Sequence, residues 1–109
     1  MEAALKAIAE PRRRAILQLV RDDERTAGQI AEAFEVTRPA ISQHLRVLKE
    51  AGLVAERRDG TRRFYRACPE GLRDVQRFLE EFWEGALRRL KAAAEDEASR
   101  ERRKGRGAT

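Results

Sequence analysis

The residues with the clearest potential for chemistry lie between positions 38 and 46. Ile41, Leu45 and Leu48 have the spacing of one buried face of a helix over 38–51. The opposite surface of this helix and its flank present Arg38, Pro39, Ser42, Gln43, Arg46 and Lys49. Arginine can pair with guanine or phosphate, glutamine with adenine, and serine with a base or a phosphate. Because the first two turns carry no carboxylate, the pattern predicts a helix that contacts double-stranded DNA in the major groove.

The same helix allows other interpretations. An ordinary amphipathic surface helix would also expose polar residues, although such helices usually mix charge signs and Glu50 is the only acid here. His44 lies next to the buried stripe, where it could bind a phosphate or a backbone group, or pack as a structural histidine. Metal binding is not expected, because the chain has no second histidine and Cys68 is its only cysteine.

A hairpin rich in arginine is expected directly after this helix. Residues 53–58 and 61–67 read as strands, and Asp59-Gly60 between them is a strong signal for a two-residue turn. Five arginines against Glu56 and Asp59 leave a net charge of +3. The arginines expected to contact the flanking DNA backbone or the minor groove are Arg58, Arg62 and Arg63. The alternative is a charged sheet edge that prevents aggregation.

Three helices are expected before residue 38, over residues 3–9, 11–21 and 27–34. Thr26 fits the N-cap of the third helix, and Gln29 three residues later completes a capping box. Only two residues then precede Thr37, the expected N-cap of the next helix. Two helices joined by so short a turn are typical of a helix-turn-helix, and the hairpin after them would be its wing. The expected fold is therefore mainly α with a small β-hairpin, a winged helix-turn-helix.

A long final helix is expected from about Glu70. Apolar residues recur along it at intervals of three and four up to position 90, and they exceed what a small winged domain can cover. The residues expected to pack against a second copy of the chain, through the first and last helices, are Leu5, Ile8, Leu79, Phe82, Trp83, Ala86 and Leu90. The alternative is that the first helix alone covers this face. Residues 1–91 are thus expected to form a DNA-binding and dimerisation domain, and residues 92–109 a helical extension with a disordered basic tail from residue 99.

Composition narrows the class of protein. The 109 residues suffice for one domain, and 24 basic against 19 acidic residues give a net charge of +5 and a pI of about 10.1. A basic domain suits a polyanionic partner, although a charge of this size also serves solubility. The lone Cys68 suits a reducing cytoplasm, and no segment has the apolar length of a membrane span. We therefore expect a cytoplasmic protein with no membrane partner.

Three motifs carry a resemblance to a known family. They are Ala-Glu-Pro-Arg-Arg-Arg-Ala-Ile-Leu at 9–17, Val-Thr-Arg-Pro-Ala-Ile-Ser-Gln-His-Leu-Arg-Val-Leu at 36–48, and the stretch 51–66 that opens with Ala-Gly-Leu-Val. Together they resemble the opening signature, recognition helix and wing of the ArsR family of winged-helix repressors, over about residues 3–91. The resemblance implies a homodimer on the bacterial nucleoid that represses transcription by occupying promoters. The family's contacts in the recognition helix map onto Arg38, Ser42, Gln43, His44 and Arg46.

Two departures from that family bear on function. Many members bind metals through a Cys-x-Cys in the third helix or through Asp, His and Glu sets in the last helix. Here residues 27–34 contain no cysteine and the last helix no histidine, so no metal or cofactor is expected and the effector stays unknown. Glu35 stands where the family's turn often has glycine. Either Glu35 takes a left-handed conformation at a cost of about 1 kcal/mol, or the turn differs.

These observations predict a sequence-specific DNA-binding regulator that acts as a homodimer. A winged helix that binds a protein or RNA is the alternative, and the exposed polar groups of Arg38, Gln43 and Arg46 favour DNA over a protein surface. An enzyme is not expected, because the chain shows no nucleophile–base pair, phosphate loop or paired carboxylates.

Overall fold

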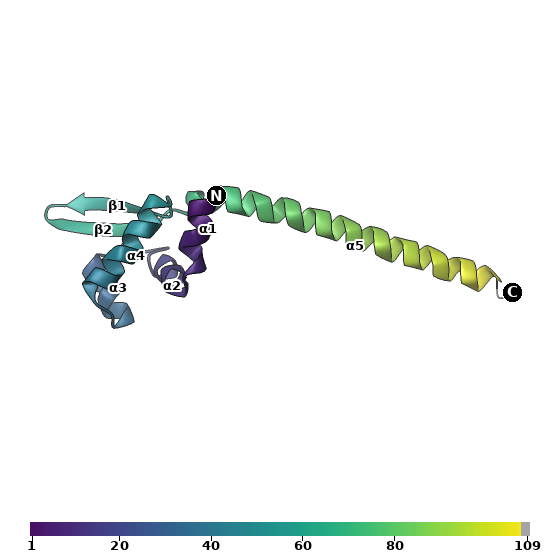
Figure 1. Cartoon of the computed structure of the whole chain (residues 1–109), viewed down its shortest axis with the longest axis horizontal. Coiled ribbons are helices and arrows are strands. Elements are labelled where there is room, and N and C mark those ends of the chain that lie inside the picture. Colours follow the sequence, from purple (N-terminus) through teal and green to yellow (C-terminus); the bar gives the residue numbers. More distant parts are fainter. Residues whose placement is uncertain (108–109) are drawn as a thin grey trace. The chain divides into compact units, whose positions relative to one another are not determined.

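The structure, a computed structural model, describes the backbone of residues 1–107 and the side chains of residues 1–103. Its elements are α1 (Glu2–Ala9), α2 (Pro11–Leu19), α3 (Ala27–Phe34), α4 (Arg38–Glu50), β1 (Val54–Asp59), β2 (Arg62–Ala67), the short 3-10 helix η1 (Pro69–Leu72) and α5 (Arg73–Gly107) (Figure 1). The chain divides into a first unit, Met1–Val75, and a second unit from Gln76 onward. The architecture is mainly helical with one antiparallel hairpin, as the sequence predicts.

The corner between α1 and α2 is held by side chains of the motif at residues 10–14. Pro11 opens α2, and the Glu10 carboxylate accepts a hydrogen bond from the backbone N–H of Arg12 at 3.3 Å. Arg13 Nε donates to the carbonyl of Ala7 at 2.7 Å, and Arg14 Nη1 to that of Ile8 at 2.7 Å. Both arginines therefore satisfy the free carbonyls at the end of α1.

The N-terminal ends of α3 and α4 confirm the predicted caps. The backbone N–H of Gln29 donates to Thr26 Oγ1 at 3.2 Å, and Gln29 Oε1 accepts from the backbone N–H of Thr26 at 2.9 Å, which completes the capping box. Thr37 caps α4 through the backbone N–H of Ala40 at 3.4 Å. Glu35 adopts the left-handed conformation with φ 55° and ψ 41°, the first of the two alternatives for this turn.

The core of the first unit consists of apolar side chains from consecutive elements. Its largest fully buried members are Ile16, Val20, Ile30, Ile41, Leu45, Leu48 and Leu53. Each of these side chains contributes about 1.5–3 kcal/mol by leaving water. Val75, in the first turn of α5, closes the same cluster. The stripe predicted for α4 is thus buried, and this burial determines which side chains of α4 face solvent.

The hairpin forms one residue later than the sequence predicts. Asp59 pairs with Arg62, so the loop consists of Gly60 and Thr61 rather than Asp59 and Gly60. Gly60 has φ 64° and is the only one of the two loop residues with a positive φ. A glycine at the first loop position is typical of a type II′ turn, which fits the twist of the strands.

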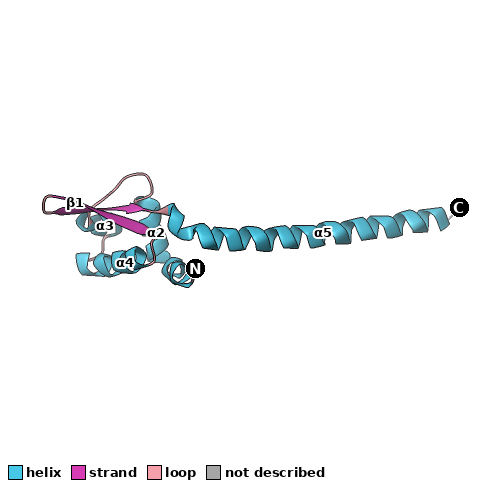
Figure 2. Cartoon of the chain, turned by 90° about the horizontal axis from the view of Figure 1, so that it is seen from above, coloured by secondary structure: helices cyan, strands magenta, loops and turns pink. Residues whose placement is uncertain are grey.

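The hairpin packs on the helix-turn-helix. β1 contacts α4, and β2 contacts α2 and α3 (Figure 2). Arg25, before α3, extends the sheet by a single bridge to Tyr65, with backbone hydrogen bonds of 3.1 and 2.8 Å. These contacts fix the strands against the helices and define a winged helix-turn-helix.

Helix α5 begins at Arg73, after η1, rather than near Glu70, and is continuous to Gly107. This differs from the disordered tail expected from residue 99; residues 108–109 lie outside the described residues. The segment is rich in alanine, glutamate and arginine, which have high helix propensity, and Arg100 pairs with Asp96 at 3.4 Å one turn earlier. No helix in the described part of the chain combines the length and hydropathy needed to cross a membrane.

Candidate nucleic-acid interface

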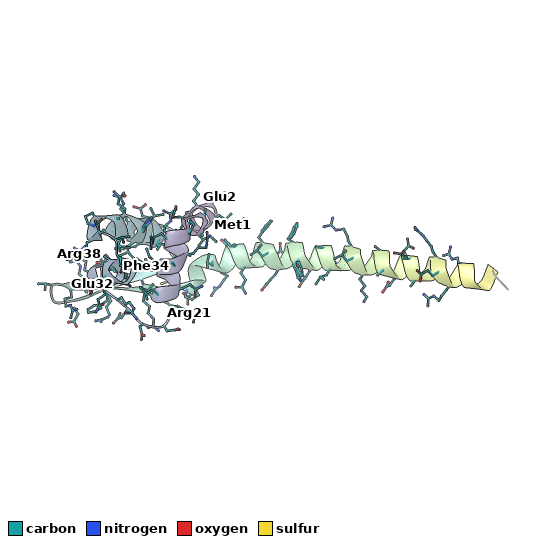
Figure 3. The ribbon with its side chains drawn as sticks, turned by 90° about the horizontal axis from the view of Figure 1, so that it is seen from below. Met1, Glu2, Arg21, Glu32, Phe34 and Arg38 are labelled. Atoms are coloured by element: carbon teal, nitrogen blue, oxygen red, sulfur yellow. The ribbon has the colours of Figure 1, made fainter. Side chains whose placement is uncertain are left out.

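The polar side chains predicted to contact DNA lie on the exposed side of α4. Burial of the stripe Ile41, Leu45 and Leu48 turns the other faces of the helix to solvent. The predicted residues exposed on this surface are Arg38, Pro39, Ser42, Gln43 and Arg46. Figure 3 labels Arg38 toward the end of the first unit opposite Met1 and Glu2. The N-terminal turns of α4 are therefore accessible to a large partner.

A groove of about 460 Å³ joins α4 to the wing. Arg38 and Ser42 line it from α4, and Arg62 and Arg63 line it from β2. The structure thus brings together four residues that the sequence predicts as DNA contacts. Gln43, His44, Arg46 and Arg58 do not line this groove, although Gln43 and Arg46 share the exposed surface of α4.

The groove also includes residues that the sequence analysis did not single out for binding. Thr26, Ala27 and Gly28 contribute the N-terminal end of α3, and Thr61 and Tyr65 complete the wing side. The Arg38 guanidinium lies 3.6 Å from the point where a Cβ on Gly28 would stand. Among the described residues, no carboxylate lines this groove, and a helix N-terminus carries partial positive charge, so the lining suits an anion. The Thr26 N-cap was the sequence signal that could have located this part.

The predicted wing arginines do not all share one face of the hairpin. Arg58 pairs with Arg63 across the strands, and Glu56 with Tyr65, which places these four side chains on one face. Arg62 lies on the other face with Arg57 and Phe64. The alternation of side chains along a strand therefore places Arg62 on the opposite face from Arg58 and Arg63. The net charge of the hairpin alone does not indicate this division.

Three cations surround Glu56 on its face of the wing. Its carboxylate accepts a hydrogen bond from Lys49 Nζ of α4 at 2.8 Å. The Nε atoms of Arg63 and Arg58 lie 3.4 and 3.8 Å from Glu56 Oε1. The hydrogen bond from Lys49 is the main cause that holds the pKa of Glu56 below its ordinary value. This acid thus links the wing to α4.

The opposite face of the wing is tied to the segment before α3. Arg57 donates to the Glu24 carboxylate through Nε at 3.1 Å and through Nη2. This hydrogen bond lowers the pKa of Glu24 and raises the pKa of Arg57. The guanidinium groups of Arg57 and Arg62 lie 4.8 and 5.2 Å from the centre of the Phe64 ring. Arg57 therefore has a structural partner, whereas Arg62 also reaches the groove.

His44 and Cys68 are the remaining side chains that the sequence singles out. His44 is partly buried beside the apolar stripe of α4, which fits its predicted position. Cys68 is a free, partly buried thiol after β2. Among the residues that the structure describes, no three His, Cys, Asp or Glu side chains are grouped so that they could hold a metal ion.

The residues predicted for a dimer interface fall into both units. In α1, Leu5 is exposed, whereas Ile8 packs partly against the core. In the second unit, Ala86 is partly buried, and large apolar side chains of α5 are exposed by between 46% and 66%: Phe78, Leu79, Phe82, Trp83, Leu87 and Leu90. An exposed row of this kind is unusual on a helix that functions without a partner.

Comparisons with known proteins agree with this architecture. A family model described as bacterial regulatory protein, arsR family, matches residues 10–56. The HTH-type transcriptional regulator Rv2034 of Mycobacterium tuberculosis is 43% identical over 86 residues, which cover 79% of this chain and 80% of that protein. The transcriptional repressor SdpR of Bacillus subtilis is 38% identical over 82 residues, which cover 75% and 91%.

A known structure shows the same fold. The homodimeric winged helix-turn-helix DNA-binding domain of Mb0332 from Mycobacterium bovis, a possible ArsR-family transcriptional regulator, is 34% identical with a TM-score of 0.62. The match covers 76% of this chain and 77% of that one. Fold and groove thus define the class of winged helix-turn-helix regulators. The chain belongs to the ArsR family of bacterial transcriptional regulators, a family of DNA-binding proteins and not of enzymes.

Proposed function

We propose that this protein is a sequence-specific regulator that binds duplex DNA as a homodimer and represses transcription by occupying promoters. The observation that carries the proposal is the acid-free groove that joins α4 to the wing, lined by Arg38, Ser42, Arg62 and Arg63. A surface with this composition matches the phosphate backbone and base edges of DNA better than it matches an apolar protein surface.

The two sides of the groove take different parts in this proposal. Gln43 and Arg46, exposed on α4 beside the groove, read base edges in the major groove, where their side chains can form paired hydrogen bonds. The groove itself, with the N-terminal end of α3, holds a backbone phosphate. Arg58, Arg62 and Arg63 contact the flanking backbone or minor groove. Phosphate contacts then set the register, and base contacts set the sequence preference.

Homodimer formation and repression are supported by the relatives. The Mb0332 domain is homodimeric, and SdpR is a transcriptional repressor. The exposed apolar row of α5 in the second unit and the exposed Leu5 in the first unit each offer apolar surface that a second copy would cover. A two-fold dimer presents two α4 helices to two half-sites, which matches a palindromic operator. Occupation of such an operator within a promoter excludes the transcription machinery.

Binding to the DNA upstream of the protein's own gene tests the proposal. The purified protein is titrated with this duplex and with a shuffled duplex of equal length, across a salt series. We expect tight and selective binding that Arg38→Ala and Gln43→Ala weaken, the loss for each being about 1–3 kcal/mol. Arg21→Ala, which removes an exposed arginine paired with Asp22 on a different part of the domain, is the matched control and should bind as the wild type does.

Two results would contradict the proposal. Equal and steeply salt-dependent affinity for both duplexes, unchanged over a panel of other promoters, would indicate an unspecific DNA-binding protein. The absence of binding to any duplex would favour the alternative, a winged helix that binds a protein or RNA.

A further inference from the structure

Glu56 is an almost enclosed carboxylate surrounded by exposed cations. Its side chain is 11% exposed, whereas those of Arg58, Arg63 and Lys49 are 69%, 56% and 55% exposed. The carboxylate is therefore shielded from solvent and lies next to three exposed cations of the wing and α4. A partner that approaches from solvent meets the exposed cations more readily than the carboxylate.

The ion pairs with Glu56 leave the terminal nitrogens of Arg58 and Arg63 available. Arg58 and Arg63 each approach Glu56 Oε1 through Nε. A guanidinium has five N–H groups in a rigid fork, so a contact at Nε leaves the terminal Nη1 and Nη2 groups for a second acceptor. Arg63 also lines the groove between α4 and the wing. Glu56 thus lies on the Nε side of two arginines that the proposed function assigns to DNA; of these, Arg63 lines the groove and Arg58 lies beside it on the same face of the wing.

We propose that Glu56 is a positioning and specificity-determining residue of the wing. It holds Arg58 and Arg63 by their inner nitrogens so that their terminal groups reach phosphates in one register, and its negative charge limits the attraction of the wing for DNA of any sequence. The inference rests on the proposed DNA-binding function and adds to it a residue that does not itself contact DNA.

The two effects of Glu56 act on different quantities: the order of the arginines sets selectivity, and the charge sets the affinity for every duplex. Without the carboxylate, Arg58 and Arg63 sample many rotamers and can meet phosphates in several registers, which favours no particular site. The cluster also gains one unit of positive charge, which strengthens binding to every duplex and steepens the salt dependence. Loss of Glu56 should therefore raise affinity for unrelated DNA more than affinity for the cognate site.

Glu50 offers a matched control for charge alone. It lies at the last residue of α4, is exposed, and makes no ion pair among the described residues. Glu50→Gln and Glu56→Gln remove the same charge by the same small change of side chain. Any difference between the two variants reports the position of Glu56 and not the net charge of the protein.

The first test compares the two variants on cognate and shuffled duplexes across a salt series. We expect Glu56→Gln to bind the shuffled duplex about threefold to tenfold more tightly and to lose at least about threefold of the cognate-to-shuffled ratio. Glu50→Gln should keep the wild-type ratio. Equal changes in the two variants, or an unchanged ratio in Glu56→Gln, would overturn the proposal. In an Arg58→Gln/Arg63→Gln background, Glu56→Gln should no longer change the ratio, and persistence of its effect there would also overturn it.

The second test needs no DNA and so separates this inference from the proposed function. NMR relaxation of the arginine Nε–Hε groups in the free protein should show ordered signals for Arg58 and Arg63 in the wild type. These signals should become mobile in Glu56→Gln and stay ordered in Glu50→Gln, and a thermal melt confirms that both variants are folded. Failure of selective binding in the wild type with this NMR result intact would reject the proposed function alone. Unchanged Nε–Hε signals in Glu56→Gln would reject the positioning role.

Discussion

The two units of the chain differ in how far their apolar side chains are buried. The first unit, Met1–Val75, encloses Ile16, Ile30 and Ile41 completely, each at 0% exposure. The second unit leaves Phe82 and Trp83 of α5 about 60% exposed. Apolar burial is the main favourable term in folding, so the first unit contains its own source of stability, and the helix of the second unit lacks one. The comparison teaches that the winged domain supplies its own apolar core, whereas the apolar row of α5 is left uncovered, as the proposed dimer requires.

The largest expected effect comes from truncating one leucine in each unit. Leu48→Ala leaves a cavity in the enclosed core and should lower the free energy of unfolding by about 2–5 kcal/mol at any protein concentration. Leu87→Ala, on the exposed row of α5, should cost under about 0.5 kcal/mol in dilute protein and more as the concentration rises. Urea unfolding at several concentrations measures both. An equal, concentration-independent loss for Leu87→Ala would mean that α5 is stabilised within one chain.

The next largest effect tests whether the exposed row is a dimer interface. Phe82→Glu places a charge where an apolar partner is expected, and it should weaken dimerisation by about 2 kcal/mol or more, roughly 30-fold in the dissociation constant. Ala93→Glu, also exposed on α5 but beyond the apolar row, is the control and should leave the constant unchanged. Sedimentation equilibrium measures the constant. If Phe82→Glu dimerises as the wild type does, the proposed interface lies elsewhere.

Much of the winged domain could be predicted because its signals are local. The capping box of Thr26 and Gln29 and the apolar stripe of α4 each lie within a few turns of one helix, and both are confirmed. The left-handed conformation of Glu35 is also local, and it is one of the two alternatives that the sequence leaves open for this turn. The end of the chain differs, because the high charge from residue 99 onward predicts a disordered tail whereas α5 continues to Gly107.

The pairing of charges could not be predicted, since it depends on contacts between distant segments. Arg57 and Glu24 are 33 residues apart in the sequence, and they meet where the neighbouring Arg25 bridges to Tyr65 of the hairpin. Lys49 reaches Glu56 because β1 packs on α4. The count of wing arginines indicated a basic surface but not which arginines are held by acids. The predicted DNA contacts therefore stay predictions at the level of single residues.

A pair of glycines sharpens the comparison of the two units. A Cβ on Gly71 in η1 would stand 2.3 Å from the carbonyl oxygen of Gly52, so Gly71→Ala must displace backbone and should cost about 1–3 kcal/mol in the free energy of unfolding. A Cβ on Gly85 in α5 meets nothing within 4 Å, so Gly85→Ala should stabilise the helix by about 0.5–1 kcal/mol. Thermal melts followed by circular dichroism measure both changes. Destabilisation by both variants to the same extent would show that α5 is packed as tightly as the domain.

The smallest effect concerns the charges of the two units and depends on pH. The pKa of Glu24 in the folded domain is lowered from 4.5 by its hydrogen bond from Arg57. The contact therefore contributes stability above the unfolded pKa and loses it as the pH falls through the lower folded pKa. Glu24→Gln should be less stable than the wild type at pH 6, and the difference should shrink as the pH falls below about 4.5.

Asp96→Asn, which removes the partner of Arg100 within α5, should leave the acid response of the winged domain as in the wild type. Urea unfolding between pH 3.5 and 6 tests this, and a constant difference for Glu24→Gln across that range would show that the wing is not held to the domain by this ion pair.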